Sequence, residues 1–234
     1  MSSDNEVKER VINTREAAMA RLKLALEYLQ SGKTEQAKLN LDRALQIDDE
    51  LDGIHASFAY FYQQVGEYDQ ADKSYRAALS QFPNNANTRN NYGAFLCERK
   101  DYDGANTQFL KAIETPENTA IANSYENAGL CALRDKNWKR SIGHLSKVLG
   151  YERNRARSIL GLTTAYLQTN DVDAATRYLR LYRQQFTQTS QSLWLAIQIE
   201  QKLENHALAE KLGQILQSNY PSSLETKLYL GKGI

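Results

Sequence analysis

The chain of 234 residues is 41% hydrophobic and 24% charged, a composition that excludes a largely disordered protein. With 29 basic and 28 acidic residues it lacks the basic excess of a nucleic-acid-binding protein. Only three prolines and twelve glycines interrupt it, which favours long helices over short strands.

Residues 1–17 are predicted to form a helical lead-in to the rest of the chain. The segment begins Met1-Ser2-Ser3-Asp4 and contains no apolar stretch of the kind found in signal peptides. Two interpretations follow: the protein is cytosolic, or the sequence is the mature domain of an exported protein without its leader.

From residue 18 onward the sequence repeats with a period of 34 residues. A small residue recurs at one position of each repeat, with spacings of 34, 34, 36, 34 and 34: Ala37, Ala71, Ala105, Ser141, Ala175 and Ala209. These positions define six units, with a two-residue insertion at 120–121 after the third: 18–51, 52–85, 86–119, 122–155, 156–189 and 190–223. Residues 224–234 are predicted to form a C-terminal capping segment and tail.

Each unit has the pattern of a helix, a turn and a second helix. Small residues such as Ala25 and Ala37 let the two helices approach closely, and large residues such as Leu41 fill the remaining space. One unit cannot bury both of its faces, so neighbouring units must stack. The pattern resembles the tetratricopeptide repeat (TPR) family. It predicts an all-α fold, a right-handed superhelix (α-solenoid) of six TPR helix-turn-helix repeats.

The turn position is occupied by different residue types along the chain. Glycine fills it in the first two units, and larger residues fill it in the other four: Gly32, Gly66, Lys100, Lys136, Asn170 and Glu204.

A search for catalytic or metal-binding patterns finds none. The three histidines, His55, His144 and His206, lie in separate repeats, without the spacing of metal ligands. Cys97 and Cys131 form no CxxC motif and are predicted to be buried free thiols in helices. We therefore expect a protein that is not an enzyme and that needs no cofactor and no metal.

Charge is distributed unevenly along the chain. Residues 1–117 carry 14 basic and 19 acidic side chains, whereas residues 118–234 carry 15 and 9. The basic excess gathers in two clusters: Arg153, Arg155 and Arg157, then Arg177, Arg180 and Arg183. Each cluster is either a solvated helix face or a docking patch for an acidic partner segment or an anionic membrane surface.

The first helices of a TPR array line its concave face, which is where a partner segment is expected to bind. In the first repeat the groove positions carry an apolar stripe: Met19, Leu22, Leu26 and Leu29. Apolar side chains exposed to water often mark an interface. The alternative is that residues 1–17 fold back as a cap and bury the stripe.

The third and fourth repeats carry asparagines near the same groove positions: Asn87, Asn90, Asn91, Asn123 and Asn127. An asparagine side chain offers one acceptor and two donors, so a row of them could hold the backbone of an extended peptide. The alternative is that asparagine is simply frequent at such positions in TPR sequences. The predicted partner-binding residues are therefore the stripe together with Asn87, Asn90, Asn91 and Asn127.

Three stretches resemble one TPR family more closely. They are the run SYRAALSQFPNNANTRNNYG at 74–93, the run NYGAFLC at 91–97 and the run YENAGLCAL at 125–133. They are similar to the type IV pilus biogenesis lipoproteins called pilotins, the PilF/PilW family.

The resemblance implies a non-enzymatic scaffold that binds the type IV pilus secretin and assists its outer-membrane localisation and multimerisation. It also implies a lipid-anchored protein at the periplasmic face of the outer membrane. No cysteine precedes Ser2, so we expect the lipid to be carried upstream of this sequence, and the sequence itself to be soluble and monomeric on its own. The alternative function is a soluble cytosolic TPR adaptor that binds an extended peptide of a partner protein. No nucleic acid is expected as a partner.

Overall fold

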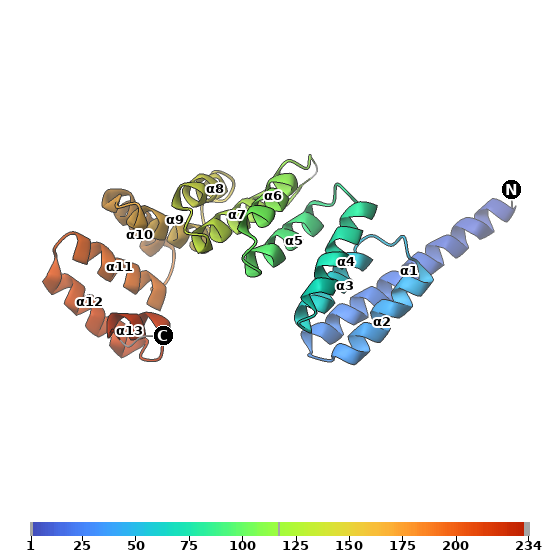
Figure 1. Cartoon of the computed structure of the whole chain (residues 1–234), viewed down its shortest axis with the longest axis horizontal. Helices are drawn as coiled ribbons and strands as arrows, with labels where there is room; N and C mark the ends of the chain where they lie inside the picture. The colour runs from blue at the N-terminus through green and yellow to red at the C-terminus, as the bar shows by residue number, and fades with distance from the viewer. Residues whose placement is uncertain (1, 117, 232–234) are drawn as a thin grey trace. The chain divides into compact units, whose positions relative to one another are not determined.

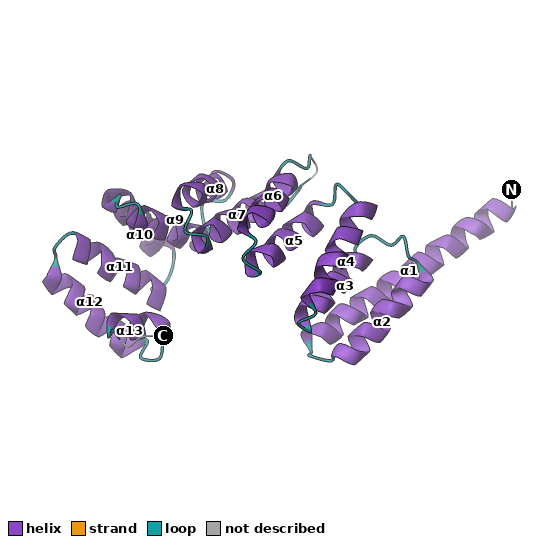
Figure 2. Cartoon of the chain, in the orientation of Figure 1, coloured by secondary structure: helices purple, strands orange, loops and turns teal. Residues whose placement is uncertain are grey.

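The computed structural model describes residues 2–116 and 118–231, and the described residues form helices joined by turns, with no strand among them (Figures 1 and 2). The expected all-α fold is thereby confirmed. In chain order the helices are α1 Ser2–Gln30, α2 Thr34–Ile47, α3 Ile54–Gln64, α4 Tyr68–Gln81, α5 Ala86–Glu98, α6 Tyr102–Ile113, α7 Ile121–Arg134, α8 Trp138–Tyr151, α9 Ala156–Gln168, α10 Val172–Gln185, α11 Ser190–Lys202, α12 His206–Asn219 and α13 Leu224–Tyr229.

The same turn joins the two helices of every pair from α1–α2 to α11–α12. Gly32 and Gly66 have φ values of 71° and 82°, and the residues at the same position in the other four turns, Lys100, Lys136, Asn170 and Glu204, have φ values between 57° and 65°. In each turn the next backbone N–H donates to the carbonyl five residues earlier, as Lys33 does to Tyr28 at 2.9 Å. This left-handed C-terminal cap satisfies the last carbonyls of the first helix and reverses the chain.

Contacts between residues divide the chain into two compact units, and the division falls inside α5. Unit 1 comprises Met1–Phe95 and Glu114–Asn118, and unit 2 comprises Leu96–Ile113 and Thr119–Ile234. Unit 1 contains 11 basic and 16 acidic residues, whereas unit 2 contains 18 and 12. The acidic excess of the sequence therefore lies in unit 1 and the basic excess in unit 2.

The core of unit 1 combines small residues where helices cross with large residues between them. Ala25 and Ala37 are fully buried and let α1 and α2 pack closely, while Phe58 and Phe61 of α3 fill the space beside them. Further along, the rings of Tyr75 and Tyr92 stack with centroids 5.1 Å apart. The Tyr92 hydroxyl donates a hydrogen bond of 2.5 Å to Asp72. Burial raises the pKa of Asp72, but this hydrogen bond and those from Arg76 outweigh it and lower the pKa below its usual value.

Helix α1 is continuous from Ser2 to Gln30 and runs past the end of α2 (Figure 1). Residues 2–17 therefore extend the first helix of the first repeat, and the alternative in which they fold back as a cap over Met19 is wrong. Met19 consequently stays exposed. Residues 2–17 are helical, and a helix that continues without a break cannot cover its own face.

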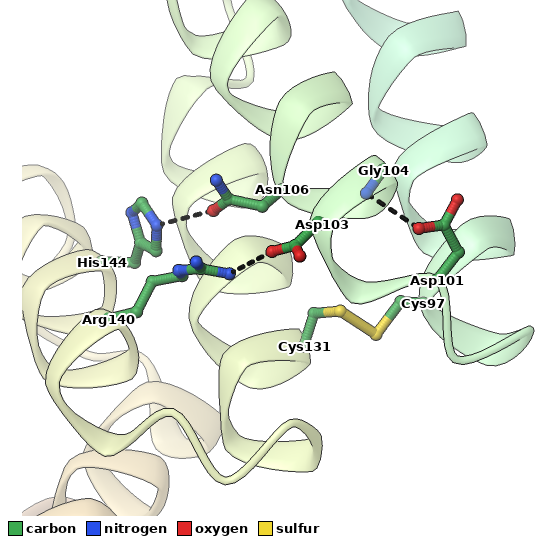
Figure 3. The surroundings of a disulfide bond; sticks show 8 residues. All are labelled: Cys97, Asp101, Asp103, Gly104, Asn106, Cys131, Arg140 and His144. Atoms are coloured by element: carbon green, nitrogen blue, oxygen red, sulfur yellow. Dashed lines mark hydrogen bonds and ion pairs between the residues drawn. A yellow bond between two sulfur atoms is a disulfide. The ribbon is translucent and has the colours of Figure 1, made fainter.

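The two cysteines of unit 2 form a disulfide, which corrects the expectation of free thiols. Cys97 of α5 and Cys131 of α7 have Cα atoms 5.9 Å apart, so the bond ties two first helices together (Figure 3). Next to it, His144 Nε2 lies 3.3 Å from the Asn106 side-chain oxygen. Burial and the positive charge of Arg140 lower the pKa of His144, which favours its neutral form.

The C-terminal end of unit 2 is closed by α13, which packs on α11 and α12. The Tyr229 ring lies so close to Gly213 of α12 that a Cβ on that glycine would come within 2.1 Å of it. This explains why a glycine occupies a position that is apolar and larger in most repeats. The last three residues, 232–234, lie outside the described part of the chain.

Candidate functional site

A groove opens on the first helices of unit 1. It has a volume of about 440 Å³ and is lined by residues of α1, of α3 and the turn before it, and of α5 with the residue before it: Leu26, Asp52, Gly53, Ala56, Ser57, Tyr60, Asn85, Asn87, Thr88 and Asn91. Segments from three consecutive repeats thus meet at one surface. We take this groove as the candidate functional site.

One wall of the groove is apolar. On α1, Leu22 and Leu26 are half-buried, and Met19 is 54% exposed on the same helix face. The Tyr60 ring of α3 adds another large side chain, 39% exposed. Because positions three and four apart share one side of a helix, the exposed apolar surface continues along α1 from Leu26 to Met19.

The wall that α5 contributes, the amide wall, presents amide groups. Asn87 and Asn91 stand one turn apart on α5 and are both exposed, and neither side chain is hydrogen-bonded to another described residue. Their helix starts where Asn85 caps it, because the Asn85 side-chain oxygen accepts a 2.8 Å hydrogen bond from the Thr88 N–H. The cap fixes the direction in which α5 leaves the preceding turn.

One carboxylate lines the groove. Asp52 is the charged residue of the lining, and its two oxygens accept hydrogen bonds of 3.0 and 3.3 Å from the Asn85 side chain. Asn85 therefore links the cap of α5 to the turn before α3. The groove as a whole has an apolar side, an amide side and a single negative charge.

The structure brings only part of the predicted site together. Leu26, Asn87 and Asn91 line the groove, and Met19 and Leu22 extend its apolar wall. Leu29 is only 8% exposed and belongs to the core, so it is not available to a partner. Asn90 is half-buried and not among the lining residues.

The asparagines of the fourth repeat belong to unit 2. There, Asn123 accepts a 2.7 Å hydrogen bond from Arg155, so its oxygen is already engaged. Asn127 is half-buried and has a partner within the protein.

Sequence reasoning missed the contribution of the second repeat. The positional rule that selects Leu26 in the first repeat selects Gly53, Ala56 and Tyr60 in the second, and all three line the groove. The signal was therefore present in the sequence. Asp52 and Asn85 could not be found this way, because they lie in turns whose path the helical period does not determine.

Within the described residues, no group of three or more His, Cys, Asp or Glu side chains is placed to hold a metal ion. The described helices also include none that is long and apolar enough to span a bilayer.

Comparisons with known proteins agree with the repeat pattern. Tetratricopeptide repeat models match residues 20–51 and 58–120. The type IV pilus assembly protein PilF of Pseudomonas aeruginosa is 35% identical over 210 residues, which cover 90% of this chain and 83% of that protein. An uncharacterised protein of Haemophilus influenzae is 39% identical over 121 residues, covering 52% of this chain and 68% of its own length.

Solved structures give the same result. The structure of Pseudomonas aeruginosa PilF matches with a TM-score of 0.80 and 33% identity, covering 94% of this chain and all of that one. The structure of PilW, a widely conserved type IV pilus biogenesis factor, matches with a TM-score of 0.81 and 26% identity, covering 91% and 98%. These matches confirm the TPR fold that the 34-residue period predicts.

Proposed function

Because the chain belongs to the PilF family of TPR proteins of type IV pilus assembly, we propose that it is a pilotin, a scaffold that binds the secretin of the pilus machine. In this role it assists the secretin to reach the outer membrane and to assemble there into a ring. The protein works by binding and catalyses no reaction. Its proposed location is the periplasmic face of the outer membrane, held by an N-terminal lipid.

The observation that carries the proposal is the groove of unit 1. An exposed Met19 and half-buried Leu22 and Leu26 leave apolar surface in water, which is costly unless a partner covers it. Tyr60 stands beside this surface, and aromatic side chains are frequent anchors in protein interfaces. A partner segment with apolar side chains fits this wall.

The amide wall favours an extended segment. Asn87 and Asn91 are one helical turn apart, a rise of about 6 Å along α5. In an extended chain, groups on the same side recur about every 6.6 Å. Each amide can therefore meet a backbone group of alternate residues in the partner. Such contacts bind the partner's backbone regardless of its side chains, while the apolar wall favours partner segments with apolar side chains.

The disulfide supports the location. Disulfides persist in oxidising compartments such as the bacterial periplasm and are rare in the cytosol. The Cys97–Cys131 bond therefore favours an exported protein over the alternative of a cytosolic adaptor.

The test is co-purification of the secretin from detergent-solubilised envelope of the source bacterium, with tagged protein as bait. We expect secretin with the native protein and none with the double variant Met19→Glu, Leu22→Glu. Because Leu22 packs against the core, a second variant, Asn87→Ala with Asn91→Ala, changes exposed groups only. We expect it to retain the fold and to bind secretin more weakly.

The matched control is Leu203→Glu with Leu208→Glu, which introduces the same charges at exposed leucines of unit 2. This control should bind like the native protein. Absence of secretin from the native sample would remove the pilotin proposal. Equal binding by all variants would leave the partner in place and move the site away from the groove.

A further inference from the structure

The two arginine clusters of the sequence differ in whether they have partners within the protein. In the first cluster, Arg155 donates to Glu152 at 2.6 and 2.8 Å and to Asn123 at 2.7 Å. It also lies 3.5 Å from Glu126, a carboxylate only 6% exposed, and Arg157 lies 3.9 Å from the same oxygen. Two of the three arginines in this cluster therefore balance internal acidic groups.

The second cluster has no such partners. Arg177, Arg180 and Arg183 are all exposed on α10, while Ala174, Ala175, Leu179 and Tyr182 form its buried face. None of the ion pairs between described residues includes any of the three arginines. Their positions span two turns of one helix, so they project from the same side of unit 2.

The second helices on either side of α10 in the array extend this charge. The outer basic face, as we name it, consists of the exposed cations of three helices: Lys139 and Lys147 on α8, Arg177, Arg180 and Arg183 on α10, and Lys211 on α12. Asp173 and Glu210 are the exposed carboxylates on these helices. Six exposed cations against two exposed carboxylates give these three second helices a net positive charge.

The chemistry of the face indicates its partner. One groove of this unit is lined by Leu167, Gln168, Gln198, Gln201 and Lys202, which belong to the first helices α9 and α11. The cations of the outer basic face are instead spread over three second helices. An acidic peptide needs a groove to hold it in one register, whereas a membrane presents a broad surface of anionic headgroups.

We propose that the outer basic face of unit 2 binds the anionic phospholipid surface of a membrane. This contact is independent of the secretin-binding proposal. It would orient unit 2 against the bilayer with its first helices directed away from the lipid, and it would add affinity to any lipid anchor, since one acyl chain alone binds a membrane only marginally.

The test is co-sedimentation of the full chain with vesicles of phosphatidylcholine, either alone or with phosphatidylglycerol. We expect binding to the anionic vesicles only, and release as salt rises, because salt screens exposed charges. The triple variant Arg177→Gln, Arg180→Gln, Arg183→Gln should lose affinity by about five-fold for each charge removed, or roughly 100-fold in all. Replacing the same three arginines with lysines should restore binding.

The matched control is Lys23→Gln, Arg43→Gln, Lys73→Gln, three exposed cations of unit 1 that belong to none of the ion pairs between described residues. It changes the net charge equally and should bind like the native protein. Equal loss by both triple variants would overturn the proposal, as would native protein that stays in solution with anionic vesicles at low salt. Release from the vesicles by a soluble decaglutamate peptide at micromolar concentration would assign the face to an acidic protein segment instead. No partner protein is present in these assays, so their outcome is independent of secretin capture.

Discussion

The first helices of the two units share one backbone pattern but carry opposite chemistry. In unit 1 they form a groove with an apolar wall, from Met19 to Leu26, and a pair of amides without internal partners, Asn87 and Asn91. In unit 2 the first helices of the fourth and fifth repeats, α7 and α9, are instead joined by internal bonds. Glu126 accepts a 2.7 Å hydrogen bond from Ser158, and Arg155 spans from Glu126 to Glu152.

The comparison teaches that a repeat determines where a surface lies and not what the surface does. The pattern of small and large core residues is common to both units, since it is needed for stacking. Groove positions are not needed for stacking and are therefore free to differ. In unit 1 they leave an apolar surface and two amides exposed, and in α7 and α9 of unit 2 they connect neighbouring repeats.

The largest expected effect concerns the covalent link in unit 2. Replacing Cys97 and Cys131 with serine should lower the free energy of unfolding of this unit by about 3 to 4 kcal/mol, because the bond closes a loop between residues 34 apart. Trp138 and Trp194, the only tryptophans of the chain, both lie in unit 2, so urea unfolding followed by tryptophan fluorescence reports this unit.

The double cysteine-to-serine variant also tests whether partner binding is confined to unit 1. Secretin capture should be retained, because every residue of the groove lies in unit 1. Treating the native protein with a reductant should reproduce the loss of stability. If capture disappears while unit 1 remains folded, the contrast between an open unit and an internally bonded unit is wrong.

A smaller effect is expected from the two carboxylates that link neighbouring repeats. Glu126→Gln should lower the free energy of unfolding by about 2 kcal/mol, because it removes the buried negative charge that pairs with Arg155. Asp72→Asn in unit 1 should cost less than about 1 kcal/mol, because that carboxylate is 32% exposed and water can replace its partners.

The two variants are compared by urea unfolding followed by circular dichroism at 222 nm. Equal losses would mean that unit 1 depends on buried charge as much as unit 2 does. A loss of stability in Asp72→Asn alone would mean that unit 1, and not unit 2, depends on buried charge.

Much of the fold could be predicted because every repeat carries the same pattern of small and large residues. Ala37, Ala71 and Ala105 each mark the same helix crossing, so an error at one repeat is corrected by the others. The turns were located in the same way. Lys136 and Glu204 adopt the left-handed conformation of Gly32 and Gly66, a property that their residue types alone would not predict.

What could not be predicted lies where the repeats differ from one another. Cys97 and Cys131 occupy different positions within their repeats, and their pairing depends on how α7 packs after the insertion at 120–121. Glu126 stands at a groove position, where a charged residue would be expected to face water. Its burial depends on Ser158 and Arg155, which are about 30 residues away. The exposed part of the apolar stripe ends at Leu26, because one more turn of helix carries Leu29 into the core.

The smallest expected effect uses one chemical change with opposite outcomes in the two units. Gly66, in a turn of unit 1, has a φ of 82°, so Gly66→Ala should lower the free energy of unfolding by about 1 kcal/mol even though an added Cβ would meet no atom within 4 Å. Gly150 lies exposed in α8 of unit 2 with equally open surroundings, and Gly150→Ala should raise the free energy of unfolding by roughly 0.5 to 1 kcal/mol. Both changes add one methyl group in open space, so urea unfolding isolates the backbone conformation as the cause. An increase in both variants would show that the left-handed turn at Gly66 carries no conformational cost. A decrease in both would show that Gly150 is favoured in α8 for a reason other than its backbone freedom.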